Sequence, residues 1–273
     1  YPNRWCRIRE CIREPAAEAL GTLVLVLIGL GVNCQVALSA NTAIVPAPMG
    51  IFLSNAFGWA LGAACGVWIS AGISGGHINP GGQVTIAMAV YRGFPWRKVP
   101  LYILGQVLGS FVAALVVYGN YFHAIDIIEG GRSVRTVPGT ASYFTSYAAD
   151  YASDLNCFFT EFLCSFVLLL VVFAITDAHN AALPPHLAPL ALFAALFCII
   201  SGLGLNTSFA INPARDFGPR LMTSIVGYGE SVWAYRHQFW LWCTVCGPLA
   251  GGLVAGGLYD ALLYTGADSV FNR

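Results

Sequence analysis

The stretch NPARD at 212–216 follows an apolar run and begins a short apolar segment, and NPG at 79–81 holds the same position earlier in the chain. Asparagine is a preferred helix cap and proline suits the first helical turn, so each Asn-Pro pair predicts the start of a helix. The apolar residues that follow each pair are too few to cross a bilayer, which takes ~20. Two such half-length helices that point their N-termini at one another would make a pore.

The composition predicts an integral membrane protein. Of the 273 residues, 57% are hydrophobic and only 10% are charged, and the mean hydropathy is +0.69. Soluble domains have about a quarter of their residues charged. Apolar runs of helix length favour an all-α bundle over a barrel. A net charge of zero and a single lysine argue against nucleic acid as a partner. The nine cysteines lie mostly in apolar runs, and we expect no metal site and no cofactor.

The apolar runs predict six full spans and two half spans in one channel domain over 1–273. The full spans are expected at about 15–38, 50–73, 99–118, 157–176, 187–205 and 239–263, and the broken segments at 74–91 and 206–225. This gives repeat 1 at about 15–120, a long loop at about 121–154 and repeat 2 at about 157–264. Glu18 precedes Asn79 by 61 residues as Glu161 precedes Asn212 by 51. An odd number of spans per repeat predicts an inverted repeat whose broken segments meet near the bilayer midplane.

The distribution of positive charge predicts the orientation. With a cytoplasmic N-terminus, eight basic residues lie inside and three lie in outer loops, the broken segment left out. This bias favours cytoplasmic N- and C-termini, so the loop 121–154 is expected outside.

The two helix starts have electrostatic consequences. Each helix N-terminus carries roughly half a positive charge, so a cation meets a barrier there while a neutral hydroxylic solute finds amide donors. Arg215 lies on the second half-helix, where inserting an arginine costs at least about 2.5 kcal/mol unless it is paired or lines water. We therefore expect it to line the pore. A salt bridge to Asp216 is the alternative, weakened because adjacent helical residues do not face one another.

At this point the motifs carry a family resemblance. HINP at 77–80, NPAR at 212–215, AEALGT at 17–22 and the six-plus-two layout resemble the aquaporin, or major intrinsic protein, family over nearly the whole chain. DFGPR at 216–220 is similar to the glycerol-facilitator branch. The resemblance implies a passive channel for glycerol and water that excludes protons and ions and is not an enzyme. It also implies a homotetramer, in the plasma membrane.

The resemblance also implies a selectivity filter. Counting from the two asparagines places it at Trp59, Phe209 and Arg215, with Ile200 as the fourth member. The family's glycerol facilitators usually have glycine at this fourth position and its water channels histidine, so the pore is either narrower here or shifted to Ser201 or Gly202. A water-selective or narrow-pore channel with poor glycerol flux is thus one alternative, and an inverted-repeat secondary transporter is another.

Further roles follow from the same resemblance. Asn79 and Asn212 are expected at the pore midplane, and Glu18, Glu161 and Asp216 as structural anchors of the loops. The pore-lining loop residues are expected to be Gly75, Gly76, His77, Asn206, Thr207 and Ser208. Gly81, Gly82 and Gln83 depart from the family's first motif. Glycine is unfavourable in a first helical turn, so this half-helix is expected to be irregular, but still capped by Asn79.

Overall fold

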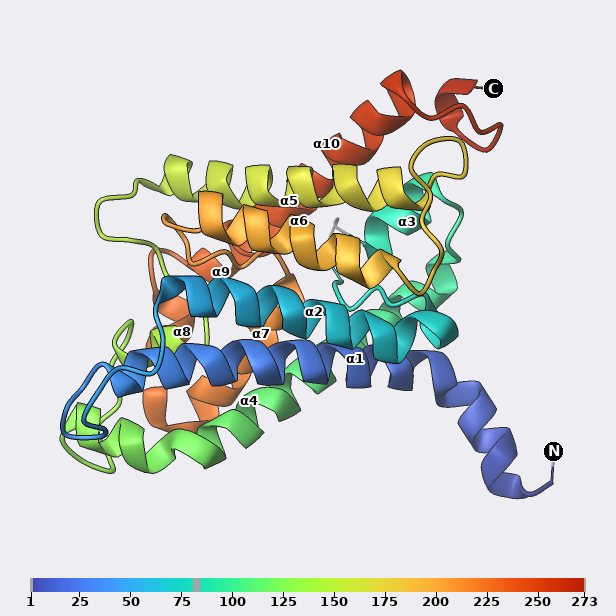
Figure 1. Ribbon diagram of the computed structural model, residues 1–273. Coiled ribbons are helices and arrows are strands. Elements are labelled where there is room, and N and C mark those ends of the chain that lie inside the picture. The colour runs from blue at the N-terminus through green and yellow to red at the C-terminus, as the bar shows by residue number, and fades with distance from the viewer. Residues whose placement is uncertain (1, 81–83, 273) are drawn as a thin grey trace.

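The computed structural model describes residues 2–80 and 84–272, and the regular structure in these residues is helical (Figure 1). This confirms the all-α class. The α-helices are α1 (Arg4–Ser39), α2 (Phe52–Ser74), α3 (Thr85–Tyr91), α4 (Val99–Glu129), α5 (Asp154–Thr176), α6 (Ala188–Leu203), α7 (Pro213–Thr223), α8 (Ser231–Ala234), α9 (Phe239–Trp242) and α10 (Cys246–Leu262). Short 3-10 or π turns occupy Trp96–Lys98, Thr140–Tyr143, Ser224–Tyr228 and Val270–Asn272.

All six expected spans are helical, but one is short. Five are long and apolar enough to cross a membrane: α1, α2, α4 with the turn before it, α5, and the segment from α9 to the end of α10. The sixth, α6, has only 16 residues. It begins after a proline-rich turn and ends before Gly204, so it rises about 24 Å, less than the ~30 Å hydrocarbon core.

Two helix boundaries differ from those expected. Helix α1 begins at Arg4 rather than near residue 15, because proline is tolerated inside it. Helix α4 continues to Glu129 rather than ending near residue 118, since no proline interrupts it before Gly130, which caps its C-terminus with a φ of +79°. The outer loop expected at 121–154 is therefore reduced to 130–153.

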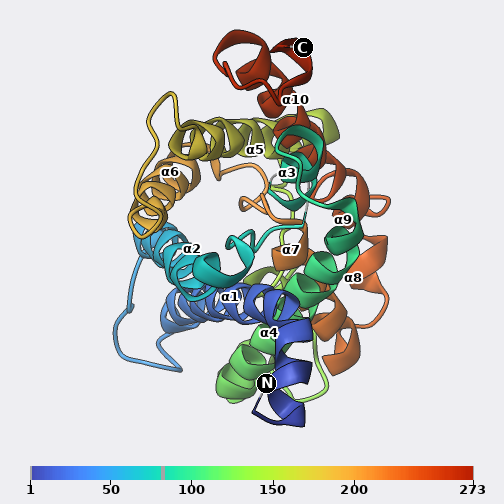
Figure 2. The same cartoon turned by 90° about the vertical axis from the view of Figure 1, so that its right-hand side faces the viewer.

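The two halves of the chain interlock. Helix α1 packs on α2 and α4, and α5 packs on α6 and α10. Each half-helix packs on the third span of the other half, α3 on α10 and α7 on α4. Figure 2, which looks from the end where both termini lie, shows the long helices around the two broken segments. The loop 130–153 lies at the opposite end (Figure 1).

Glycines let the spans approach closely. A Cβ on Gly109 of α4 would lie 2.0 Å from the carbonyl oxygen of Ala19 on α1. In the second half, a Cβ on Gly251 of α10 would lie 2.1 Å from the carbonyl oxygen of Phe162 on α5. The same helix pair in each half is thus packed backbone against backbone, as small residues allow in membranes.

Candidate pore and selectivity filter

The second half-helix begins as its sequence predicts. The Asn212 side-chain oxygen accepts hydrogen bonds from the backbone N–H groups of Ala214, at 3.0 Å, and Arg215, at 3.2 Å, and Pro213 occupies the first turn. Helix α7 is therefore capped at the point where it enters the centre of the molecule.

The first half-helix begins later than expected. Helix α3 starts at Thr85, six residues after Asn79, with Val84 at the N-cap position and no side-chain cap. Asn79 is therefore not the N-cap residue of the described helix, and the expected cap falls on the glycine-containing insertion between them. The insertion itself, residues 81–83, lies outside the described residues. Both the N–H and the hydroxyl of Thr85 donate to the Asn79 carbonyl, at 3.3 and 3.0 Å, which ties the helix start back to the motif.

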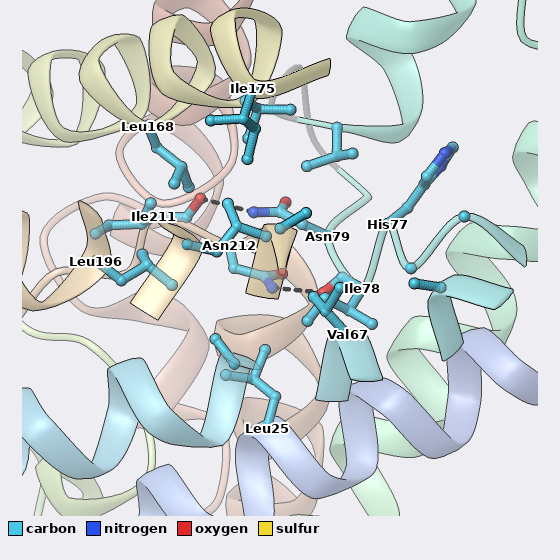
Figure 3. A pocket seen from close by; sticks show the side chains of 18 of the residues that line it. Leu25, Val67, His77, Ile78, Asn79, Leu168, Ile175, Leu196, Ile211 and Asn212 are labelled. Atoms are coloured by element: carbon cyan, nitrogen blue, oxygen red, sulfur yellow. Dashed lines mark hydrogen bonds between the residues drawn. The ribbon is translucent and has the colours of Figure 1, made fainter. Parts of the chain in front are cut away.

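Each asparagine side chain forms a hydrogen bond with the loop of the other half. The Asn212 amide donates to the carbonyl of Ile78 at 2.8 Å, and the Asn79 amide donates to the carbonyl of Ile211 at 3.3 Å. Each acceptor directly precedes the opposite asparagine. Figure 3 shows both amides in the middle of a cavity, each reaching across to the other half.

Two buried glutamates hold these loops at equivalent places. Glu18 accepts from the N–H groups of His77, at 3.0 Å, and Ile78, at 2.6 Å, and from the Ser74 hydroxyl at 2.5 Å. These donors lie two, one and five residues before Asn79.

Glu161 repeats this pattern in the second half. It accepts from the N–H groups of Ala210, at 2.8 Å, and Ile211, at 2.7 Å, and from the Thr207 hydroxyl at 2.6 Å, at the same three offsets from Asn212. The inverted repeat thus extends to individual hydrogen bonds.

The backbone before each asparagine is strained. Ile78 has a φ of +43° and Ile211 a φ of +54°, in the left-handed region that β-branched residues avoid. In both, the N–H is bonded to a glutamate and the carbonyl to the opposite asparagine. Such a conformation persists only where its surroundings hold it.

A single cavity of about 500 Å³ passes the asparagines. Most of the side chains that line it are apolar, among them Leu25, Val67, Leu168 and Leu196 (Figure 3). The expected site residues that line it are Trp59, Gly75, Gly76, His77, Asn79, Ile200, Phe209, Asn212 and Arg215. At the end remote from Trp59 it reaches the α5–α6 loop at Leu183 and Pro185.

The residues expected to form a filter lie together. The Arg215 guanidinium carbon is 4.4 Å from the Trp59 ring centroid and 5.6 Å from that of Phe209, and the two rings are 6.2 Å apart. Ile200 lines the same cavity and is buried, whereas Ser201 and Gly202 are exposed. The alternative of a shift to Ser201 or Gly202 is therefore not adopted.

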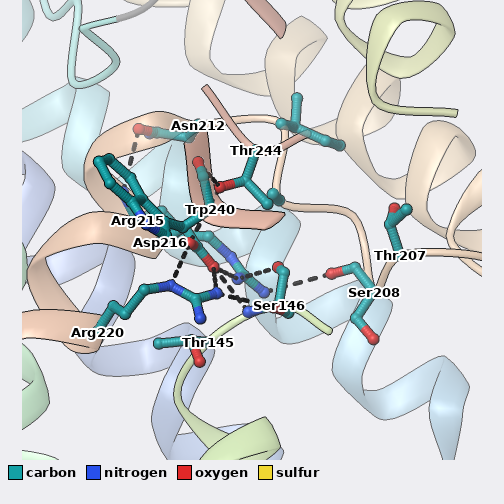
Figure 4. Close-up of polar contacts among 12 residues, drawn as sticks. Thr145, Ser146, Thr207, Ser208, Asn212, Arg215, Asp216, Arg220, Trp240 and Thr244 are labelled. Atoms are coloured by element: carbon teal, nitrogen blue, oxygen red, sulfur yellow. Dashed lines mark hydrogen bonds and ion pairs between the residues drawn. The ribbon is translucent and has the colours of Figure 1, made fainter. Parts of the chain in front are cut away.

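Arg215 is held by the loop 130–153 and by the Ser208 carbonyl. Its Nη1 donates to the Ser146 hydroxyl at 2.7 Å and its Nη2 to the Ser208 carbonyl at 3.4 Å (Figure 4). Its Nε has no hydrogen-bond partner within the described chain, although the side chain lines the cavity. The Nε atom itself is buried, so the part of the side chain that borders the cavity is not this donor.

Asp216 anchors the loop 130–153 and pairs more closely with Arg220 than with Arg215. Its nearest approach to Arg215 is 4.0 Å, whereas Arg220 donates to both of its carboxylate oxygens, at 3.0 and 3.2 Å. It also accepts from the Ser146 N–H at 2.7 Å and the Thr244 hydroxyl at 3.0 Å. The sequence analysis did not assign Ser146, Arg220 or Thr244 to this site. The i,i+4 spacing of Asp216 and Arg220 is a signal that could have identified Arg220, whereas nothing in the sequence marks the loop serine.

Three expected lining residues have a different place. Asn206, Thr207 and Ser208 are not part of the cavity lining, which in this loop begins at Phe209. The Thr207 hydroxyl is bonded to Glu161, the Asn206 carbonyl accepts from Ala149, and the Ser208 carbonyl accepts from Arg215. Each of these groups thus holds the loop through a hydrogen bond to a neighbouring part of the chain.

A helical membrane bundle with a central cavity and two broken helices is the architecture of a membrane channel or transporter. The sequence signature described as "Major intrinsic protein" matches residues 6–259, so the chain belongs to the major intrinsic protein family.

Individual relatives agree with this assignment. Aquaporin-6 of Laccaria bicolor is 52% identical over the whole of this chain and 86% of the relative. The aquaglycerol porin AQY3 of Saccharomyces cerevisiae is 41% identical over the whole of this chain, which spans 41% of that protein. The X-ray structure of the aquaglyceroporin from Plasmodium falciparum superposes with a TM-score of 0.81 and 27% identity, covering 92% of this chain and 96% of that one.

Proposed function

We propose that this membrane channel conducts glycerol and water passively and excludes protons and ions, with Trp59, Ile200, Phe209 and Arg215 as its selectivity filter. The family consists of channels rather than enzymes, and its members similar to this chain include aquaporins and aquaglyceroporins. The observation that carries the proposal is the cavity beside Arg215, where one wall is aromatic and the other offers a guanidinium.

The two walls match the two sides of a polyol. Glycerol has a carbon backbone, which fits against the rings of Trp59 and Phe209, and hydroxyls, which accept hydrogen bonds from the guanidinium. The rest of the lining is mainly apolar, so a solute keeps few bonds to the wall and passes without being trapped.

Ion exclusion has two sources. Arg215 places a positive charge at the constriction, and the N-terminus of α7 adds a partial positive charge near Asn212. The asparagine amides present donors to a permeating oxygen at the midplane, which is unfavourable for cations.

Ile200 limits the width of the pore at the fourth filter position. An isoleucine occupies volume that a glycine would leave open, so the filter is narrow for glycerol and leaves water comparatively unhindered. We propose that water passes faster than glycerol for this reason.

The membrane setting is also part of the proposal. Both termini lie at one end, together with the segment between α3 and α4 (Figure 1). This segment carries Arg92, Arg97 and Lys98, which supports a cytoplasmic end by the positive-inside rule. We further propose a homotetramer in the plasma membrane, on the basis of the family resemblance.

Stopped-flow light scattering on proteoliposomes tests the proposal. Wild-type protein is expected to raise both water and glycerol flux above empty liposomes. Arg215→Ala removes a charge close to the path. Proton leak, followed with an enclosed pH dye, is expected to rise at least about tenfold, because a partly screened unit charge within a few ångströms adds more than about 1.4 kcal/mol to the barrier for a proton. Glycerol flux equal to that of empty liposomes, with water flux raised, would overturn the glycerol assignment.

A further inference from the structure

The first part of α1 extends beyond the bundle. Figure 1 shows it bending away from the other helices at the end where the C-terminus also lies. The bend follows from Pro15 inside α1, which lacks the N–H that would bond to the preceding turn. Residues 4–13 of this segment are exposed apart from Cys6, which is half-buried.

The exposed segment is amphipathic. Trp5, Ile8 and Ile12 follow the i, i+3, i+7 spacing of one helix face, and their side chains are 59%, 43% and 45% exposed. With the ~100° turn per residue of an α-helix, Arg4 and Arg9 lie on either side of this apolar stripe. Arginines in such flanking positions extend to a polar boundary while their stems lie along apolar surface.

Residues 4–14 carry four arginines and two glutamates, so the net charge of the segment is +2. Arg4, Arg7, Arg9 and Arg13 form no ion pair within residues 2–80 and 84–272. Of the two acids, Glu14 is paired with Lys98 at 2.7 Å, and Glu10 lies on the helix side nearly opposite the apolar stripe. Four guanidinium groups are therefore available to a negatively charged partner.

We propose that residues 4–14 form an interfacial helix that binds anionic phospholipids of the protein's own membrane. A helix of about ten residues is marginally stable in water by itself. This segment would be stabilised by a surface that both buries its three large apolar side chains and pairs with its four arginines. An anionic bilayer offers acyl chains to the stripe and phosphates to the arginines. The segment is continuous with the first span, which holds it at membrane level.

Hydrogen exchange with mass spectrometry on the full chain in lipid nanodiscs tests this. Amides of residues 4–14 should exchange at least about tenfold more slowly in phosphatidylcholine mixed with phosphatidylserine than in phosphatidylcholine alone, because each arginine near an anionic surface adds to binding. Replacing all four arginines by glutamine should abolish the difference.

Two further variants separate the contributions. The triple variant Trp5→Ser, Ile8→Ser and Ile12→Ser should reduce the protection of these amides from exchange in both lipids. Arg132→Gln, which changes an exposed arginine in the loop at the other end, should leave the difference between the two lipids unchanged. Equal exchange in the two lipids, or protection that persists in the four-glutamine variant, would overturn the proposal. The readout does not depend on permeation, so it is independent of the proposed channel selectivity.

Discussion

Ser146 uses all of its polar groups to contact α7. Its N–H donates to Asp216 at 2.7 Å, its carbonyl accepts from Arg220 at 2.8 Å, and its hydroxyl accepts from Arg215 at 2.7 Å. The residue is fully buried. One loop serine therefore positions the guanidinium that faces the cavity.

We expect Ser146→Ala to weaken ion exclusion with little loss of water flux. The alanine keeps both backbone bonds and removes only the hydroxyl. The charged guanidinium of Arg215 thereby loses a hydrogen bond worth about 1.5–3 kcal/mol and leaves its place beside the cavity part of the time. Proton leak into proteoliposomes, followed with an enclosed pH dye, should increase at least about twofold.

The matched control is Ser142→Ala, an exposed serine of the same loop whose hydroxyl bonds only to the nearby Gly139 carbonyl in the described structure. Ser146→Thr retains the hydroxyl and should restore exclusion. An equal leak in Ser142→Ala and Ser146→Ala would show that the loop acts by general stability and not through Arg215.

Ile200 offers a second prediction at this scale. Ile200→Gly opens the fourth wall of the cavity, so glycerol flux should rise relative to water flux. Stopped-flow scattering with each solute measures the ratio. Cys198→Gly is the control, because it puts a glycine, with its cost of up to about 1 kcal/mol, on an exposed face of the same helix. A ratio that is unchanged in Ile200→Gly would mean that Ile200 does not limit glycerol.

At the level of elements, the close backbone contact between α1 and α4 contributes to the stability of the folded protein. Gly109→Ala on α4 places a Cβ 2.0 Å from a carbonyl oxygen of α1, and a backbone atom cannot move away as a side chain does. Overpacking of this kind costs about 1–3 kcal/mol. The variant should unfold at a lower temperature in detergent, measured by the loss of the monodisperse peak after heating.

Gly119→Ala on the same helix is the control. A Cβ there meets nothing within 4 Å, so the higher helix propensity of alanine should leave stability unchanged or slightly increased. If both variants lose stability equally, close packing at Gly109 is not the cause.

The two half-helices show how far the sequence predicts this fold. Helix α7 follows from local chemistry alone, since cap, proline and apolar segment are adjacent in the chain. Helix α3 does not, because residues between Asn79 and Thr85 separate the motif from the helix start. The sequence does not predict the extension of α4 beyond residue 118, because polar residues end the apolar run there. The helix itself continues, since no proline interrupts it before Gly130.

The candidate site was predictable to a similar degree. Trp59, Ile200, Phe209 and Arg215 line one cavity as expected. Ser146 could not be found, because its contacts join residues 69 or more positions apart and depend on how the outer loop folds. The place of Thr207 outside the lining depends in the same way on a buried glutamate in another helix.

At the scale of the whole molecule, the interlocked repeats bear on the transport mechanism. An alternating-access transporter rocks one repeat against the other. Here each asparagine is bonded to the loop of the opposite repeat, and each half-helix packs on a span of the other repeat. Rocking would break these contacts together, so the structure favours a continuous path through a fixed frame.

Few of the groups in the described cavity lining could couple transport to an ion gradient. Among the described lining residues only His77 and Arg215 are titratable. Glu18 and Glu161 are fully buried and each accepts at least three hydrogen bonds from the loops, which holds them as anchors and not as proton carriers.

We therefore expect glycerol influx and efflux to be equal at equal and opposite gradients, and unaffected by a proton or sodium gradient. Stopped-flow scattering on proteoliposomes measures both directions, and empty liposomes correct for leak through the lipid. Rates should rise in proportion to the glycerol gradient, because no step requires the frame to rearrange. Accumulation of glycerol against its gradient when a proton or sodium gradient is imposed would contradict this, since a fixed path between two interlocked repeats has no means of coupling one flux to another.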